Sequence, residues 1–192
     1  IEQGDFAGRI ADDRISAFLV GPGLGRDDSA RERLERVLAR KVPTVLDADA
    51  LHLLDRTMLD SADPAKLCIT PHKGELAQLC ATFGIGAEGK LDRTHALREA
   101  TGLTVLAKGP DTILQSDVMT SFFPRGSSWL SVAGTGDVLA GIAASRLAAH
   151  GNPGRACEEA VWLHHEAARL AWPAFSAGDL ARAVKPAMAA FL

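Results

Sequence analysis

The feature that most limits the fold of this chain is a unit that recurs three times in its first half. A short apolar run is followed by glycines or by polar and acidic residues, and then by the start of a helical pattern; the runs are residues 16–20, 43–46 and 67–70. Short apolar runs bounded by turn residues are typical of buried strands. Strands that alternate with helices form parallel sheets, and ligands collect at the carboxyl edge of such sheets. We therefore expect an α/β protein with a binding crevice at that edge.

The first run ends in the glycine-rich loop Gly21-Pro-Gly-Leu-Gly25. Gly21, Gly23 and Gly25 lack side chains, so a ligand could approach the main chain closely here. A single glycine-rich loop is also typical of an ordinary tight turn, and the sequence alone leaves both interpretations open.

The second run leads into Asp47 and Asp49. Alternate residues of an extended segment point the same way, so both carboxylates could face one crevice. There they could position a polar substrate or hydrated magnesium, which prefers oxygen ligands. Asp49 could equally cap the following helix.

The third run leads through Pro71 and His72 to Glu75, in the first turn of an expected helix. An isolated histidine is more often structural or exposed than functional, so His72 carries little weight by itself.

The second half begins with two β-branched runs within residues 103–115, separated by the turn Lys108-Gly-Pro-Asp111. This pattern predicts a hairpin. Lys108 could neutralise a nucleotide phosphate or simply occupy the turn. Residues 119–123 are expected to form a further strand, and residues 127–130 a loop.

Two glycines and a carboxylate, Gly134-Thr-Gly-Asp137, then open a helical pattern rich in small residues. A helix N-terminus has unpaired amides and a partial positive charge, and glycines let an anion reach those amides. The pattern therefore indicates an anion cradle. Asp137 would be unfavourable beside an anion unless it acts as a base or helps to hold a cation. The alternative is that Thr135 or Asp137 only caps the helix.

Amphipathic or alanine-rich patterns predict four further helices, at residues 29–40, 89–101, 156–172 and 178–191, the last kinked near Pro186. His164 and His165 are adjacent and so are expected on different helix faces, which argues against a shared metal.

Composition excludes several classes of protein. Hydrophobic residues make up 47% of the 192, charged residues 23%, and the net charge is −3, so nothing suggests nucleic-acid binding. The three cysteines are far apart, which disfavours a disulfide scaffold or a zinc site and predicts buried thiols.

No apolar run is long enough to span a bilayer and no signal peptide is evident, so we expect a cytoplasmic protein without membrane partners. The chain begins at Ile1 with a polar stretch, which suggests a start inside a domain.

Gly134-Thr-Gly-Asp137 resembles the anion-hole motif of ribokinase-like enzymes. Five blocks in order are similar to those of the ADP/ATP-dependent NAD(P)H-hydrate dehydratases: the glycine loop, Asp47-Ala-Asp-Ala-Leu51, Thr70-Pro-His-Lys-Gly-Glu75, Lys108-Gly-x-x-Thr112 and the Gly134 motif. The resemblance implies a three-layer α/β/α sandwich with a mostly parallel sheet and a hairpin near the nucleotide. It implies one domain over residues 1–192 that lacks its amino-terminal portion, and assembly as a homo-oligomer, often a tetramer.

The resemblance also implies site roles. Asp137 would take a proton from the hydroxyl of hydrated NADH or NADPH as ADP or ATP donates a phosphoryl group, and no residue decides between the two donors. Substrate-side candidates are Asp137, His72 and the glycine loop, joined by Asp47 and Asp49. Mg²⁺ would bridge the phosphates through water held by Glu75. The nucleotide would contact Lys108, Gly109, Pro110, Asp111, Thr112, Gly134, Thr135 and Gly136.

Two alternatives share these residues. A ribokinase-like kinase of a small alcohol, such as a vitamin precursor or a sugar, would release a stable phosphoester; kinases of that kind typically have Asn where this chain has His72. A non-catalytic nucleotide-binding module would bind nucleotide without using any acceptor.

Overall fold

The computed structural model describes residues 6–191, in which six strands form one sheet. The strands follow one another in chain order across the sheet: β1 (Phe18–Val20), β2 (Thr44–Leu46), β3 (Leu67–Ile69), β4 (Thr104–Ala107), β5 (Ile113–Gln115) and β6 (Thr120–Phe122). Strands β1 to β4 are parallel, and β4, β5 and β6 are antiparallel. The predicted parallel sheet, the hairpin and the additional strand are confirmed.

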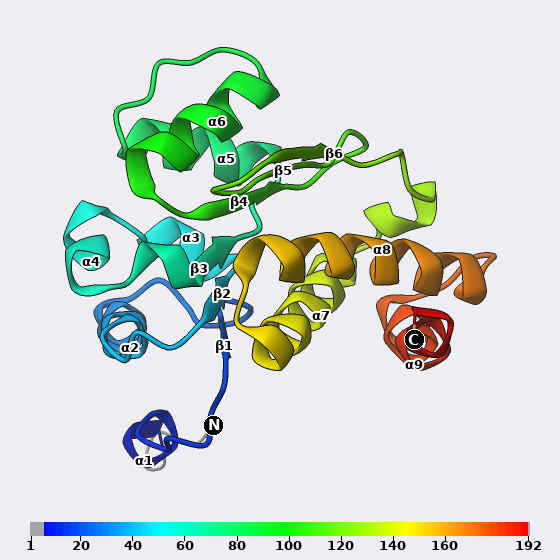
Figure 1. Cartoon of the computed structure of the whole chain (residues 1–192), viewed down its shortest axis with the longest axis horizontal. Coiled ribbons are helices and arrows are strands. Elements are labelled where there is room, and N and C mark those ends of the chain that lie inside the picture. Colours follow the sequence, from blue (N-terminus) through cyan, green and yellow to red (C-terminus); the bar gives the residue numbers. More distant parts are fainter. Residues whose placement is uncertain (1–5, 192) are drawn as a thin grey trace.

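Helices cover both faces of this sheet, as Figure 1 shows. One face carries α2 (Asp28–Leu38), α3 (Asp49–Leu53), α4 (Arg56–Ser61), α5 (Lys73–Thr82) and α6 (Lys90–Thr101). The other carries α7 (Thr135–His150), α8 (Pro153–Ala171) and α9 (Ala177–Phe191), which contains Pro186 as expected. The three-layer α/β/α sandwich is therefore confirmed. Within residues 6–191, no helix combines the length and apolarity that crossing a membrane requires.

Alternation along the strands separates two hydrophobic cores. Val45 and Cys68 pack with α7, α8 and α9. Their chain neighbours Leu46 and Ile69 pack with the helices of the opposite face. Successive side chains of a strand point to opposite faces, so continuous apolar runs are needed when both faces are covered. The three cysteines are buried and free.

Several short helical segments were not predicted from the sequence. Residues 127–130, predicted as a loop, lead into a short 3-10 helix, η3 (Ser128–Ser131), because the Ser127 hydroxyl accepts a hydrogen bond from the Trp129 amide and starts a turn. A second 3-10 helix, η2 (Pro64–Lys66), precedes β3. The polar stretch at residues 2–13 includes a short helix, α1 (Phe6–Ile10); the part before residue 6 lies outside the described residues.

The ends of β1 and β2 approach each other so closely that only glycine fits at the first position of the loop. Gly21 has φ +134°, and a Cβ atom there would lie 1.6 Å from the Asp47 carbonyl oxygen. This contact places the glycine loop against the acidic segment that follows β2.

Candidate active site

The start of α7 forms an uncapped helix N-terminus. Gly134 is the N-cap residue, with φ +86°, and no side chain caps the helix. The Thr135 hydroxyl instead donates to the carbonyl oxygens of Leu130 (2.6 Å) and Val132 (2.7 Å), while the Asp137 side chain is exposed in the first turn. Capping by Thr135 or Asp137 is therefore wrong. In the described part of the chain, the amides of Gly136 and Asp137 have no acceptor, which is the condition for an anion cradle.

A buried ion pair lies beside this cradle. The Lys108 ammonium, at the end of β4, donates to Asp47 Oδ1 at 2.7 Å. Asp47 is 2% exposed and Lys108 18%. A Cβ atom on Gly136 would be 3.5 Å from Lys108 Nζ, so the cation is next to the helix start.

His164, on α8, forms a hydrogen bond with the main chain at the start of α7. Its Nε2 atom lies 2.9 Å from the Thr135 carbonyl oxygen, to which it donates. His164 is 6% exposed, and burial is the main cause that lowers its pKa to about 4. Burial also lowers the pKa of His165. His164 is therefore neutral at pH 7.

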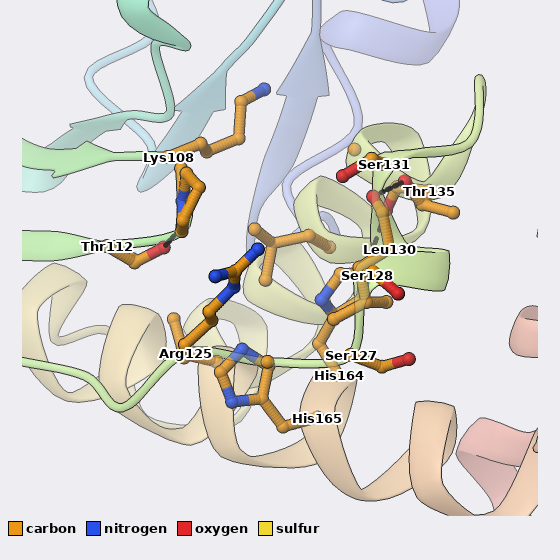
Figure 2. Close-up of a pocket in the computed structure, with 16 residues that line it drawn as sticks. Lys108, Thr112, Arg125, Ser127, Ser128, Leu130, Ser131, Thr135, His164 and His165 are labelled. Carbon is orange, nitrogen blue, oxygen red and sulfur yellow. Dashed lines mark hydrogen bonds between the residues drawn. The ribbon is translucent and has the colours of Figure 1, made fainter.

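A pocket of about 190 Å³ opens between the Lys108 turn, the 3-10 segment η3 and α8. Figure 2 shows Arg125, Thr112 and His165 on one side and the serines of η3 with Thr135 on the other. Although His164 and His165 are adjacent in sequence, both line this pocket.

Most of the predicted nucleotide-binding residues are found at this pocket. Lys108, Gly109, Pro110, Thr112, Thr135 and Gly136 line it. Asp111 does not: its carboxylate turns outward to Lys90 Nζ at 2.8 Å, an ion pair that lowers the pKa of Asp111. Gly134 contributes as the N-cap of α7 rather than as a lining residue.

Six polar residues of the pocket were not predicted as site residues from the sequence. Their signal was weak, because they are single polar residues on a loop and a helix without a spacing that indicates a ligand; they are Arg125, Ser127, Ser128, Ser131, His164 and His165. The sequence shows only that the arginine and the three serines come shortly before the Gly134 motif. The two histidines are on α8, and only the tertiary structure brings them to the pocket.

On the other side of the cradle, Asp49 binds the glycine loop. Its carboxylate accepts from the Gly25 amide (3.1 Å) and from Arg26 Nε (2.7 Å), and the Arg26 contact is the main cause that lowers the pKa of Asp49. The expected alternative that Asp49 caps α3 is wrong, because Ala48 is the N-cap residue and no side chain caps that helix. Asp47 and Asp49 thus pair with different cations.

His72 and Glu75 form a capping box at the start of α5. His72 Nδ1 accepts from the amides of Gly74 (3.0 Å) and Glu75 (3.2 Å), and the His72 amide donates to Glu75 Oε2 at 2.7 Å. The His72 side chain is nevertheless 62% exposed, so its ring can meet a ligand while it caps the helix. The Glu75 carboxylate is 7% exposed.

Direct metal ligands are not gathered here. Among residues 6–191, no group of three or more His, Cys, Asp or Glu side chains could hold a metal ion. The expected role of Glu75, which would hold magnesium through water, stays a prediction.

Comparisons with known proteins agree with this geometry. The family model described as NAD(P)H-hydrate dehydratase matches residues 5–188. The chain is 39% identical over 175 residues to the bifunctional NAD(P)H-hydrate repair enzyme Nnr of Thermanaerovibrio acidaminovorans, covering 90% of this chain and 34% of that protein. It is 37% identical over 185 residues to the ADP-dependent (S)-NAD(P)H-hydrate dehydratase of Neisseria meningitidis, covering 90% and 62%.

A solved structure shows the same fold. The ADP/ATP-dependent NAD(P)H-hydrate dehydratase of Bacillus subtilis, co-crystallised with ATP/Mg²⁺ and soaked with CoA, aligns with a TM-score of 0.76 and 26% identity over 92% of this chain and 67% of that one. The chain thus spans about a third to two thirds of the length of these relatives. With its ordered motifs at one sheet edge and a family match over almost all of its length, this chain belongs to the NAD(P)H-hydrate dehydratase family.

Proposed function

We propose that this chain dehydrates hydrated NADH or NADPH by phosphorylating the ring hydroxyl and eliminating phosphate. The observation that carries the proposal is the uncapped start of α7, where an exposed carboxylate, Asp137, lies one residue from Gly136 and its free amide. A base beside an anion cradle is the arrangement that phosphoryl transfer to a hydroxyl requires.

In the proposed reaction, Asp137 accepts the proton of the substrate hydroxyl. The hydroxyl oxygen bonds to the terminal phosphorus of ADP or ATP, and the bond between that phosphorus and the bridging oxygen breaks, leaving AMP or ADP. The C–O bond of the phosphoester then breaks, phosphate leaves with the electron pair, and loss of a ring proton restores the dihydropyridine. The amides at Gly136 and Asp137 stabilise negative charge on the phosphoryl group during transfer.

Nucleotide and substrate occupy opposite sides of the cradle in this proposal. The pocket between Lys108, Arg125 and His165 has two cationic side chains at its lining, which suits an anionic nucleotide. The glycine loop, Asp49 and the exposed ring of His72 follow β1 to β3 and form the substrate side. Mg²⁺, when bound with the nucleotide, neutralises phosphate charge, and Glu75 would orient one of its waters.

The test is the return of reduced-nicotinamide absorbance when hydrated NADPH is mixed with the protein, Mg²⁺ and either ADP or ATP. Recovery with stoichiometric release of phosphate supports the proposal and identifies the donor. Asp137→Asn should abolish turnover and leave nucleotide affinity nearly unchanged. Asp92→Asn is the matched control, because Asp92 is an exposed carboxylate at the same position in the first turn of α6.

Other outcomes point to the alternatives. Accumulation of a stable phosphoester would favour a small-alcohol kinase, and bound nucleotide with no acceptor used would favour a binding module. Full activity in Asp137→Asn would refute the role of that carboxylate.

We further propose that the protein is a homo-oligomer, a tetramer by family resemblance. Large apolar side chains exposed on or next to α8, Trp162, Leu170 and Trp172, support a buried contact there. Light scattering of the purified protein tests this, and a monomer at micromolar concentration would contradict it.

A further inference from the structure

We propose that Asp47 is a positioning residue that holds the Lys108 ammonium beside the start of α7, where Lys108 contacts the phosphoryl group while it is being transferred. This role differs from the direct substrate contact that the sequence suggested for Asp47. The inference rests on the proposed function, because it assumes that a phosphoryl group is transferred at this cradle.

The two partners are held by rigid main chain. The Asp47 amide donates to the Val20 carbonyl (3.1 Å), and its own carbonyl accepts from the Ala50 amide (3.2 Å). The Lys108 amide donates to the Pro71 carbonyl at 2.8 Å. The side-chain pair therefore spans β3, between the ends of β2 and β4, on backbone that is fixed on both sides.

The burial of the Asp47 carboxylate explains why it forms an ion pair with Lys108. Asp47 is 2% exposed, and within the described residues its carboxylate accepts a hydrogen bond from Lys108 alone. A buried carboxylate without a partner is strongly unfavourable, so Asp47 keeps the ammonium in place. An ammonium has three N–H donors, and Lys108, at 18% exposure, retains donors that a ligand can use.

The position of the ammonium suits the transferring group. No side chain separates it from the cradle, since a Cβ atom on Gly136 would lie only 3.5 Å from Nζ. Figure 2 shows the Lys108 side chain extending away from Arg125 and His165, which line the more distant part of the pocket. Lys108 is thus placed for the phosphoryl group at the amides of α7 rather than for the remainder of the nucleotide.

The chemistry needs a fixed cation at this point. Negative charge on a transferring phosphoryl group spreads over its three equatorial oxygens, and preorganised donors stabilise it. A lysine side chain has many rotamers, so without Asp47 the ammonium would leave this position for part of the time. Interactions that strengthen only in the transition state change kcat more than KM.

The first test compares steady-state kinetics of four proteins on hydrated NADPH: wild type, Lys108→Met, Asp47→Asn and the double variant. We expect Lys108→Met to lower kcat by about 10²-fold to 10³-fold, with KM for the nucleotide changed by less than about threefold. Asp47→Asn should lower kcat less. In the double variant, Asp47→Asn should add nothing to the effect of Lys108→Met, because Asp47 acts only through Lys108.

Two further variants separate positioning from folding. Lys108→Met leaves Asp47 buried without a partner and can fail to fold, whereas the double variant removes both charges and keeps the comparison possible. Lys108→Arg should restore part of kcat. Asp55→Asn is the control: it breaks the ion pair of Asp55 with Arg31 (2.7 Å) far from the cradle but keeps a side chain that can cap α4. Its kcat should be unchanged.

The second test does not depend on the substrate. Binding of AMP or ADP is measured by calorimetry with Mg²⁺, with and without aluminium fluoride, which mimics a phosphoryl group in transfer. Aluminium fluoride should tighten binding by wild type at least about tenfold, and this gain should be lost in the double variant while affinity for the nucleotide alone is retained.

The results of the two tests distinguish a failure of the proposed function from a failure of the inference about Lys108 and Asp47. If wild type does not act on hydrated NADPH, the proposed function fails and the calorimetric test of Lys108 still stands. Equal tightening in wild type and the double variant, or no tightening in wild type, overturns the inference about Lys108. Kinetic effects of Asp47→Asn that add fully to those of Lys108→Met overturn the positioning role of Asp47.

Discussion

Replacing His164 with Gln should remove a large part of the acid sensitivity of the fold. Burial lowers the pKa of His164 from 6.5 to about 4, so the native state resists protonation over this range while the unfolded state accepts it. Because the pKa of His164 is lower in the folded state than in the unfolded state, the stability linked to the neutral ring is fully present above pH 6.5. This stability is lost as the pH falls toward 4. The loss is about 1.4 kcal/mol for each pH unit in this window.

Between pH 7 and pH 5 this amounts to about 2 kcal/mol of unfolding free energy, because protonation of the unfolded state begins just above pH 6.5. His164→Gln keeps a side-chain N–H that can donate to the Thr135 carbonyl, which His164 contacts at 2.9 Å, but cannot titrate. The variant should therefore lose about 2 kcal/mol less than wild type over this range.

Urea unfolding at pH 7, 6 and 5 measures the difference between the two proteins. His165, whose pKa burial also lowers, and the ion-paired carboxylates contribute to the pH dependence of both proteins and cancel in the comparison. His95→Gln is the control, since His95 is an exposed histidine outside the pocket. Parallel stability curves for wild type and His164→Gln would refute the reasoning.

Substitutions at three positions test local geometry through urea unfolding. Gly21→Ala should cost at least about 2 kcal/mol, because its Cβ would lie 1.6 Å from the Asp47 carbonyl oxygen at φ +134°; a neutral change would mean that the two strand ends separate easily. Ala48→Gly should stabilise the protein by about 1 kcal/mol, because Ala48 has φ +47° and ψ −121°, a backbone conformation that is strained for alanine and not for glycine. Reduced stability of this variant would show that Ala48 is not strained. His72→Ala should cost about 1 kcal/mol through loss of the capping box and His72→Asn much less, whereas equal losses would show that capping is not what His72 contributes.

Local pattern was sufficient for most of the fold. Short apolar runs predicted the strands and helical periodicity predicted most of the helices, because side-chain burial in a layered protein follows the geometry of each element. α7 ends at His150, and α8 begins at Pro153 rather than at the predicted residue 156, because proline suits the first helical turn. The glycines before Asp137 likewise indicated an open helix N-terminus, since that property depends only on adjacent residues.

Capping by His72 was beyond such reasoning, because histidine is not among the residues that usually cap helices. The same holds for contacts between distant parts of the chain. Lys108 and Asp47 are 61 positions apart and meet only because β3 lies between β2 and β4 in the sheet. His164 reaches Thr135 because α8 packs against the start of α7.

The sequence by itself determined most of the strands and helices and the glycines that open α7, since both depend on residues within a few positions of one another. The tertiary structure decided the partners of Asp47, Asp49 and Lys108, and it brought the pocket residues from the loop before η3 and from α8 together. The physical reason is that a charged side chain pairs with whichever group the order of strands and the packing of helices place within reach, and local periodicity does not specify that order.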